Sequence, residues 1–506
     1  MGPTIILDKS TLQGLNAIPF VFAQVTAIWY FVFASNQTTR EAVTMTRQGC
    51  STFSTDESNR ILDRLAGLEK IITPDQIMQA LVATDRVNRH RCKLSNEVML
   101  WVVLGMGLFT TLPIRQVFKH ARRMRKEEES PPRSSLCEAR KRLGVEPVKY
   151  LHEHTVKPLA TPETPGAFWR GLRWVGIDSS VYDAPDSPAN AAAFSRATGS
   201  RGDGAFPQVR KASLVELGTH VELAIAIGGW QDSEQTLARQ LWDRLPSDSI
   251  LLEDRGFFSY DDWKELDGRG QKLLVRVKSN MILEPFQKLS DGSYLAKIYP
   301  SSYDRAKDRN GIVVRVIAYT IDDSQRTGHQ QEHRFITNLL DETQYPAMEF
   351  IIGYHERWEH ELVYDEQKTH QDPRRAEKPA NLRSETPDGV RQELYALSLA
   401  HFVVRALMFE AARPAKLDVD RLSFVGCFRI LQCRLPECIA TTAQSFDQWY
   451  ENLLWEMRRE MIEARRNRIN PRVIKRKMSK WMKKRPEHCN LPPLKKSFVE
   501  SVVMNT

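Results

Sequence analysis

Cysteine is scarce in this chain, with seven residues among 506. Cys427, Cys433 and Cys438 have five and then four residues between them, which matches no common zinc or disulfide pattern. An odd number of widely spread cysteines is typical of reduced thiols in a cytosolic protein. We therefore expect a cytoplasmic location, with neither a disulfide framework nor a zinc module.

Long hydrophobic runs are almost absent as well. The one exception is the run of eighteen residues from Ala17 to Ala34, at the lower edge of the ~20 residues that span a bilayer. It contains Pro19 and Gln24, and it lacks both a preceding basic flank and a small-residue cleavage site. The pattern favours a buried or poorly specified N-terminal helix, so we expect no membrane association.

Positive charge is unevenly distributed along the chain. The formal net charge is +9, whereas residues 456–496 alone contain 15 Lys and Arg against 4 Glu, which leaves a net charge of −2 for all other residues. A nearly neutral body with a basic C-terminal stretch favours a polyanionic partner. The hydrophobic content of 42% excludes a wholly disordered chain, and the length predicts about two to four domains.

Helices are predicted before residue 145. The signals are a possible cap near Thr55, a cap at Ser95, and a capping box from Ser135 to Glu138 followed by a stop at Gly144. The stretch 115–142 contains ten Lys and Arg against four Glu. It is a candidate DNA-binding surface, although a solvated helix face has the same composition.

A proline-rich joint at 158–166 separates these helices from a mixed α/β pattern. After the joint, the predicted order is strand, strand, strand, helix, strand, helix, strand. More strand-like sequence is inserted at about 281–345, and helices follow from about Phe350 and from about Val390.

Two predicted strands end at a carboxylate. RWVGI gives out at Asp178, and SILLE gives out at Asp254. A carboxylate at the end of a buried strand is costly unless it is paired or binds a metal. Either residue alone is more typical of a cap or a turn, so a third ligand is needed before they predict a site.

The third ligand is on a predicted helix. Tyr354, Arg357, Glu361 and Lys368 are separated by 3, 4 and 7 positions, which places them within about 60° of one another on a helical surface. One interpretation is a surface helix with an i,i+4 ion pair. The other is a phosphodiester site, in which the acid holds a metal and the cations hold phosphate oxygens. Two aspartates and one glutamate supply the oxygen ligands that two Mg²⁺ ions need.

The chain resembles the DDE transposases of bacterial insertion sequences whose signature is Tyr-x2-Arg-x3-Glu-x6-Lys. Tyr354, Arg357, Glu361 and Lys368 match the signature at every spacing. The two aspartate motifs match as well, in GIDSS and in LLEDRGFFSY. Further stretches that look typical of this family are residues 206–220, 382–408 and 470–485. The resemblance extends over about residues 50–490.

The resemblance implies a fold class and a set of domains. The expected fold is α/β: a ribonuclease-H-like catalytic domain with a β-rich insertion, between an all-helical DNA-binding domain and a basic helical tail. We expect boundaries at 1–48 for an atypical apolar segment, 49–157 for the helical domain, 167–415 for the catalytic domain with its insertion at about 281–345, and 416–506 for the tail. Residues 1–48 have no counterpart in the family, and Met45 is a candidate for the working start.

The resemblance also implies an activity. Asp178, Asp254 and Glu361 would ligate two Mg²⁺ ions, for which Mn²⁺ is an expected substitute. The DNA-binding residues would be Tyr354, Arg357 and Lys368, with Arg255, Lys475, Arg476 and Lys477 as further candidates. The enzyme would bind the terminal inverted repeats of its element, cleave them and join the 3′-hydroxyl to target DNA. A homodimer on double-stranded DNA in the bacterial nucleoid is expected by analogy.

Two other functions agree with parts of the sequence. A decayed transposase would keep its fold and DNA affinity without catalysis, but a single lost carboxylate would suffice for that, and all three are present. A ribonuclease-H-like nuclease with another role would not need the Tyr354–Lys368 signature or the basic stretch. Both are therefore less favoured than an active transposase.

Overall fold

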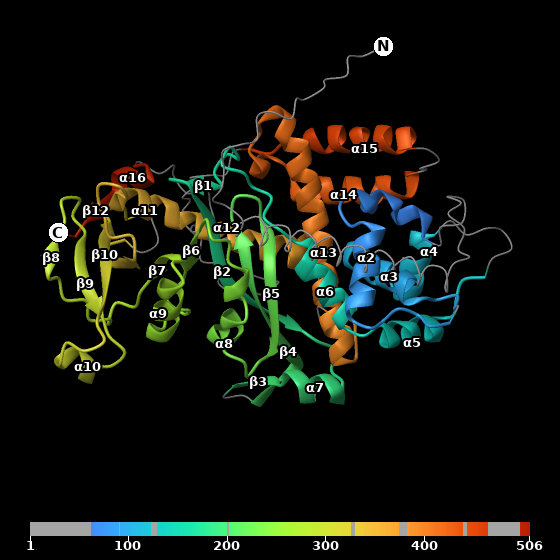
Figure 1. The fold of residues 1–506 in the computed structure, drawn as a ribbon, viewed down its shortest axis with the longest axis horizontal. Helices are drawn as coiled ribbons and strands as arrows, with labels where there is room; N and C mark the ends of the chain where they lie inside the picture. Colours follow the sequence, from blue (N-terminus) through green and yellow to red (C-terminus); the bar gives the residue numbers. More distant parts are fainter. Residues whose placement is uncertain are drawn as a thin grey trace, which may run out of the picture. The chain divides into compact units, whose positions relative to one another are not determined.

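The computed structural model describes residues 62–90, 92–122, 129–199, 202–324, 329–373, 382–438, 443–463 and 496–505. The chain divides into two compact units, and the elements below lie in the unit formed by residues 61–87 and 94–506 (Figure 1). The expectations for residues 1–48, including Met45, and for Lys475, Arg476 and Lys477 lie outside the described residues.

A group of helices precedes the sheet. They are η2 (Asp63–Lys70), α2 (Pro74–Ala83), α3 (Asn96–Leu108), α4 (Ile114–Ala121), α5 (Arg133–Leu143) and α6 (Glu146–Thr155). Polar caps fix two of their starts: Thr73 and Gln76 form a reciprocal capping box on α2, and the Ser95 hydroxyl accepts a hydrogen bond from the Val98 amide, as predicted for α3.

The start of α5 differs from the prediction. This helix begins at Arg133, after Pro132, and no side chain caps it, so the capping box from Ser135 to Glu138 is wrong. The fixed φ of proline, here −63°, prepares the chain for a helix without a side-chain cap. Glu138 pairs instead with Lys141 inside the helix. The predicted end at Gly144 is confirmed, with a φ of 74° that suits glycine.

The described strands form one mixed sheet of twelve, in the order β3-β4-β2-β6-β7-β11-β10-β9-β8, with β1, β5 and β12 paired at its sides. The strands are β1 (Phe168–Trp169), β2 (Leu172–Asp183), β3 (Arg196–Gly199), β4 (Gly202–Glu216), β5 (Val221–Gly229), β6 (Ser249–Glu253), β7 (Lys272–Arg276), β8 (Gln287–Lys288), β9 (Tyr294–Ile298), β10 (Ile312–Ile321), β11 (His333–Thr337) and β12 (Val502–Met504). β6 pairs in parallel with β2 and β7, and the other pairs are antiparallel.

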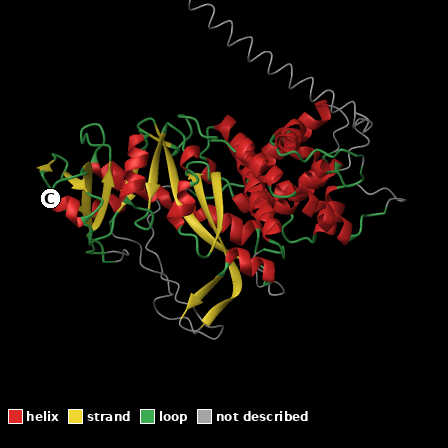
Figure 2. Ribbon diagram, turned by 60° about the horizontal axis from the view of Figure 1, so that its bottom comes forward, coloured by secondary structure: helices red, strands yellow, loops and turns green. Residues whose placement is uncertain are grey.

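The predicted order of strands and helices is confirmed. It is formed by β2, β4, β5, α8 (Glu234–Arg239), β6, α9 (Tyr260–Gly268) and β7. The inserted strands β8 to β11 extend the same sheet, because β11 pairs with β7. Shorter helices lie in the loops: α7 (Pro188–Phe194), η3 (Trp242–Arg244) and α10 (Ser302–Ala306). Figure 2 shows the hairpin of β3 and β4 extending beyond the helices beside it.

The long helix α13 (Pro387–Ala412) is the centre of the helical layer. It packs against β5 on one side and against α3, α6, α14 (Phe424–Arg434) and α15 (Ala443–Arg458) on others, as Figure 1 shows. This helix is long and apolar enough to cross a membrane, but 89% of its most apolar stretch is buried inside the protein. A mainly apolar helix that is covered by protein on most sides is a core helix.

The proline-rich joint is tied to the sheet. The backbone amides of Leu159 and Ala160 both donate to the Glu216 carboxylate at 3.1 Å, and Arg173 pairs with the same carboxylate. Glu216 is fully buried at the end of β4. Because a buried carboxylate is costly without such partners, these contacts fix the path of the joint between α6 and β1.

The described residues after α13 are not helical throughout. Residues 413–438 and 443–458 are mainly helical, with η6 (Arg413–Ala415), η7 (Val419–Arg421) and η8 (Leu435–Glu437) beside the longer helices. Most of the predicted basic tail lies outside the described residues. The last described residues instead form the short helix α16 (Phe498–Ser501) and β12, which pairs antiparallel with β10. The apolar sequence FVESVVM at this point can pair with an open sheet edge. We did not predict this strand, because the sequence just before it is highly charged.

We expect Phe498→Ala to lower the free energy of unfolding by about 3–5 kcal/mol, because this ring is buried and lies 4.2 Å from the ring of His355. Urea unfolding measures the loss. Val499 is 48% exposed in the same helix, so Val499→Ala is the matched control and should change stability by less than about 0.5 kcal/mol. Equal effects of the two substitutions would show that α16 does not dock as described.

Candidate active site

The parallel pairing of β2 and β6 brings two predicted ligands to one edge. The register pairs Gly176 with Leu252, and both Asp178 and Asp254 follow two residues later. Because the carboxyl ends of parallel strands meet at one edge of a sheet, the two aspartates lie at the same level. Asp254 directly follows the end of β6, as predicted.

The prediction that the first strand ends at Asp178 is wrong. β2 continues to Asp183, because β4 pairs with it along its whole second half. What changes at Asp178 is burial: residues 173–177 are buried, and residues 178–181 are partly exposed, past the point where β6 has ended. The aspartate therefore lies within a strand, beside the gap that the shorter strand leaves.

Asp178 is partly buried, with 24% of its side chain exposed. Its Oδ1 accepts a hydrogen bond from the Ser179 amide at 2.8 Å, and its Oδ2 lies 3.3 Å from Arg357 Nη1. Burial raises the pKa of Asp178 to about 6, and Glu361 and Glu234 add to the increase while Ser179 and Arg357 oppose it. The side chain is thus a carboxylate whose charge is disfavoured in the protein alone.

Asp254 lies in a turn at the end of β6. Its carbonyl accepts a hydrogen bond from the Phe257 amide, and its Oδ1 accepts one from the Arg255 amide at 2.8 Å. The backbone of the turn therefore fixes the orientation of the Asp254 carboxylate. Arg255 itself is exposed, so the structure leaves its side chain at the surface beside this edge.

The predicted helix with the signature residues is continuous but not uniform. After α11 (Ala347–Gly353), the chain forms the 3₁₀-helix η4 (Tyr354–Arg357), the α-helix α12 (Trp358–Asp365) and the π-helix η5 (Glu366–Gln371). The prediction of one α-helical stripe is therefore corrected. Turns of three widths carry the signature, and a π-turn inside a helix is often found at functional sites. We call residues 354–371 the Glu361 segment.

The side chains of Tyr354 and Lys368 reach the edge formed by β2 and β6. The Tyr354 hydroxyl donates to the Glu253 carbonyl at 3.1 Å. Lys368 Nζ donates to the Ser180 hydroxyl at 2.8 Å and to the Val181 carbonyl at 2.7 Å. The Glu361 segment is therefore attached to both strands that carry the aspartates.

Arg357 lies between two of the predicted ligands. Its guanidinium is 3.3 Å from Asp178 and 3.7 Å from Glu361, and the side chain is almost fully buried. Burial alone would lower the pKa of Arg357, but Tyr354 and the nearby carboxylates raise it. Its Nε is buried and has no hydrogen-bond partner among the described residues. The guanidinium supplies positive charge where the three carboxylates converge.

A second group of acidic side chains lies behind this edge. The ligand atoms of His220, Glu359 and Asp420 are within 4.8 Å of one another, so they could also hold a metal ion. The sequence predictions did not include them. The Glu361 segment also buries Tyr364, Glu366 and Gln367 on this side, away from the signature residues.

One signal could have revealed the buried group. Charged residues interrupt otherwise apolar predicted strands, as Lys211 does in VRKASLVEL and Glu222 does in HVELAIAIGG. Both are fully buried, and Lys211 Nζ lies 2.7 Å from Glu222 Oε1. A charge in a buried strand requires a partner on another element, and the sequence alone does not say which one.

Comparison with known proteins gives the family. Residues 62–153 match the model for the insertion element 4 transposase N-terminal region, and residues 170–403 match the model for the transposase DDE domain. The chain is 28% identical over 427 residues to the transposase InsG for insertion sequence element IS4 of Escherichia coli K12, which covers 82% of this chain and 93% of that protein. The chain belongs to the IS4 family of transposases.

This IS4-family transposase also shares some structure with a solved complex. The neighbour is the piggyBac transposase synaptic complex with hairpin DNA, at a TM-score of 0.39 and 12% identity, over 78% of this chain and 86% of that one.

The family confirms the resemblance and part of the expected fold. The match to the DDE domain contains Asp178, Asp254 and the whole Glu361 segment, and the match to the N-terminal region covers η2 to α6 up to residue 153. The chain is thus a transposase with a mixed α/β DDE domain. The roles of single residues and the predicted domain boundaries stay predictions.

In the metal-free protein, we expect Asp178→Asn to raise the melting temperature above about pH 6. The folded pKa of Asp178 is above its ordinary value of 3.8, so ionisation disfavours the folded state, and stability falls as the pH rises between these values. Below about pH 4 the carboxyl is neutral in both states, and the advantage of asparagine should disappear. Melting curves in EDTA at about pH 4 and pH 7.5 measure the difference.

The control is Asp243→Asn, since the Asp243 side chain is 87% exposed and pairs only at the surface with Arg269. Its effect should not depend on pH in this way. An Asp178→Asn protein that is less stable than the parent by the same margin at both pH values would contradict the expectation.

Proposed function

We propose that this transposase binds the terminal repeats of its insertion sequence, cleaves the DNA there and joins the freed 3′-hydroxyl to target DNA. The observation that carries the proposal is the convergence, within the DDE domain, of Asp178 in β2, Asp254 after β6 and the Glu361 segment at one edge of the sheet. An in-line displacement at phosphorus fits such a site, since it needs charge and positioning more than covalent chemistry.

The donor set suits divalent metal ions. Asp178, Asp254 and Glu361 would hold them, and carboxylate oxygens are the ligands that Mg²⁺ prefers, with Mn²⁺ as an expected substitute. The position of Arg357 between two of these carboxylates supports the fit, because it marks a place where positive charge is favoured. Two ions bound there would stabilise the attacking and leaving oxygens of the displacement.

The cationic side chains would hold the DNA backbone. Arg357 has a planar fork of donors, which suits the oxygens of a phosphate. Lys368 is fixed by Ser180 and Val181 beside Asp178, and its ammonium lies at the same edge. The phenol of Tyr354 orients the turn after β6 through the Glu253 carbonyl, and Arg255 offers a further cation at the surface.

Further DNA contacts would lie outside the catalytic edge. The family match at residues 62–153 supports a DNA-binding role for the N-terminal helices, within the proposed domain at 49–157. Lys475, Arg476 and Lys477 would contact backbone phosphates. We further propose a homodimer that holds two DNA ends, in the cytoplasm where the bacterial nucleoid lies.

Retention of Asp178 argues against a decayed enzyme. Burial disfavours the charge of this carboxylate, so keeping it costs the protein stability when no cation is bound. A DNA-binding remnant would lose nothing by replacing it. The active enzyme is therefore favoured over the remnant.

Glu361→Gln tests the proposed activity. We expect it to reduce both cleavage and strand transfer by at least about a hundredfold, since loss of a ligand should cost more than the 10–100-fold typical of outer-shell contacts. The assay uses duplex DNA that carries the element's own terminal repeats, a target plasmid and Mg²⁺. Asp365→Asn is the control, because Asp365 is exposed on the same helix and, among the described residues, its ion pair is with His370.

The outcomes separate the candidate functions. Cleavage by the parent and by Asp365→Asn, but not by Glu361→Gln, supports the proposal. Equal products from all three proteins would remove Glu361 from the mechanism. Binding without cleavage by the parent protein would favour the remnant.

For the basic stretch, we expect neutralisation of Lys475, Arg476 and Lys477 to weaken binding to all DNA sequences alike. Each lost phosphate contact should flatten the slope of log K against log salt by about 0.9, so the triple variant should flatten it by up to about 3. Titrations at several salt concentrations measure the slope. Neutralising the exposed Lys264, Lys288 and Lys307 removes the same charge, and an equal flattening there would assign the effect to net charge alone.

A further inference from the structure

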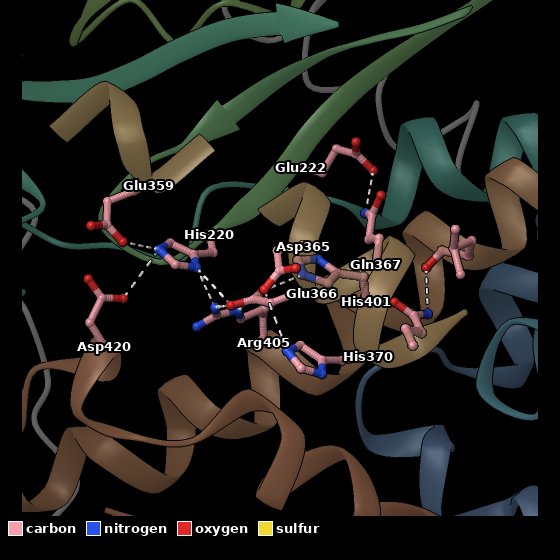
Figure 3. A network of polar contacts seen from close by, with 12 residues as sticks. His220, Glu222, Glu359, Asp365, Glu366, Gln367, His370, His401, Arg405 and Asp420 are labelled. Carbon is pink, nitrogen blue, oxygen red and sulfur yellow. Dashed lines mark hydrogen bonds and ion pairs between the residues drawn. The ribbon is translucent and has the colours of Figure 1, made fainter. Parts of the chain in front are cut away.

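The Glu361 segment has a second, buried face that the proposed chemistry does not use. The signature residues face the edge of β2 and β6, whereas six polar side chains point into the protein. They are Glu359, His360, Tyr364, Glu366, Gln367 and Gln371, all buried. Figure 3 shows part of this face, with its contacts to His220 in the turn between β4 and β5, to Glu222 on β5, and to His401 and Arg405 on α13. We call it the inner face.

The strongest contacts of the inner face are made by Glu366. Its Oε2 lies 3.1 Å from Arg405 Nε and 2.9 Å from His401 Nε2, and its Oε1 contacts Arg405 Nη2 as well. Arg405 and His401 are one helical turn apart on α13. Arg405 of α13 thus holds Glu366, the first residue of η5, through a bidentate, charge-assisted pair.

His220 joins the same network from the turn between β4 and β5. Its Nε2 lies 2.7 Å from Glu359 and 3.4 Å from Asp420, and its Nδ1 lies 3.1 Å from Glu366. Burial and Arg405 lower the pKa of His220, but Asp420, Glu366 and Glu359 raise it to about 9. The His220 ring therefore bridges three elements, α12, η7 and η5.

Tyr364 ties the inner face directly to the strand of the first aspartate. Its hydroxyl donates to the Asp178 carbonyl at 2.8 Å and lies 2.9 Å from the Ser213 hydroxyl of β4. Three residues further along the helix, the Gln367 side chain accepts a hydrogen bond from Lys211 Nζ at 2.6 Å and donates one to Glu222 at 3.0 Å. The backbone of β2 at Asp178 is therefore linked to a side chain of the Glu361 segment.

Such contacts restrict rotation in a way that apolar packing does not. A hydrophobic interface tolerates small shifts, whereas a buried hydrogen bond or ion pair depends on direction and costs several kcal/mol when one partner is left unpaired. Rotation of the Glu361 segment would break the contacts of Glu366 and Tyr364 together. The same rotation would turn Glu361 and Arg357 away from Asp178.

We propose that Arg405 and Tyr364 are positioning residues for the metal-binding edge: through the inner face they fix the rotation of the Glu361 segment, and thus the direction of the Glu361 carboxylate. This inference rests on the proposed function, because it takes Asp178, Asp254 and Glu361 as the metal ligands. Neither residue touches the DNA or the ion in this scheme. Their effect is on how well the ligands are aligned before the ion binds.

The test is Mn²⁺ binding to the full chain without DNA, measured by calorimetry and by the spin resonance of free Mn²⁺. Arg405→Lys keeps the charge but loses the bidentate fork. We expect it to weaken Mn²⁺ binding by about tenfold, as outer-shell substitutions do. Arg315→Lys is the matched control: Arg315 is also fully buried and paired, with Asp291, but on β10 and without contact to residues 354–371. It should leave Mn²⁺ affinity unchanged while lowering the melting temperature.

Tyr364→Phe keeps the inference testable if Arg405→Lys does not fold. It removes one buried hydroxyl and changes no volume, and it should also weaken Mn²⁺ binding severalfold. If the folded variants melt at lower temperature than the parent but bind Mn²⁺ as tightly, the two residues are only structural and the inference is wrong.

Glu361→Gln distinguishes the two levels of the argument. Loss of Mn²⁺ binding in this variant, with parental affinity in Arg405→Lys and Tyr364→Phe, would leave the proposed function intact and overturn the positioning role alone. Parental Mn²⁺ affinity in Glu361→Gln would overturn the metal assignment and the positioning role with it.

Discussion

Burial of opposite charges on different elements is the constraint on which the rest of the structure depends. Arg405 on the core helix pairs with Glu366 on the π-turn, and Lys211 on β4 pairs with Glu222 on β5. Removing one member of such a pair strands the other in a medium of low dielectric, at a cost of about 3–5 kcal/mol. The sheet, the core helix and the Glu361 segment therefore keep one relative arrangement, which apolar packing alone would hold less strictly.

The edge that carries the proposed metal ligands has the opposite property: its charges are not balanced within the protein. Its carboxylates are drawn together beside a single guanidinium, and the raised pKa of Asp178 shows that the protein alone does not fully compensate their charge. Sites of this kind are destabilising by design, because the charge they lack is supplied by what they bind. The rigid pairs behind the edge provide the stability that the edge itself gives up.

The sequence predicted the order of strands and helices well, because apolar runs and turn residues are local signals. It also located Asp254, where the end of a short strand coincides with the end of its apolar run. It failed where a neighbour decides. β2 runs past Asp178 because it pairs with β4, which is longer than β6. The helix α5 begins after Pro132, ahead of Ser135, whose hydroxyl we expected to cap it. The length of a neighbouring strand cannot be predicted from the sequence of β2, and the sequence of α5 does not show which of two possible starts the helix takes.

The candidate site divides in the same way. The four signature residues are recognisable from spacing, although the π-turn that carries Lys368 is not, since a wider turn has no local sequence pattern. His220 and Arg405 lie 185 positions apart and meet only in the folded core. Lys211 and Glu222, as charges in apolar strands, are the signals in the sequence that such buried partners exist.

The pairing of β12 with β10 has a consequence for how a disturbance would spread through this unit. Phe498, which precedes β12, packs against His355 beside the signature tyrosine. It also belongs to the buried cluster that contains Ile321 of β10 and Tyr354. A protease cut or a local opening between α16 and β12 would therefore disturb the packing around the first turn of the Glu361 segment, far away along the sequence.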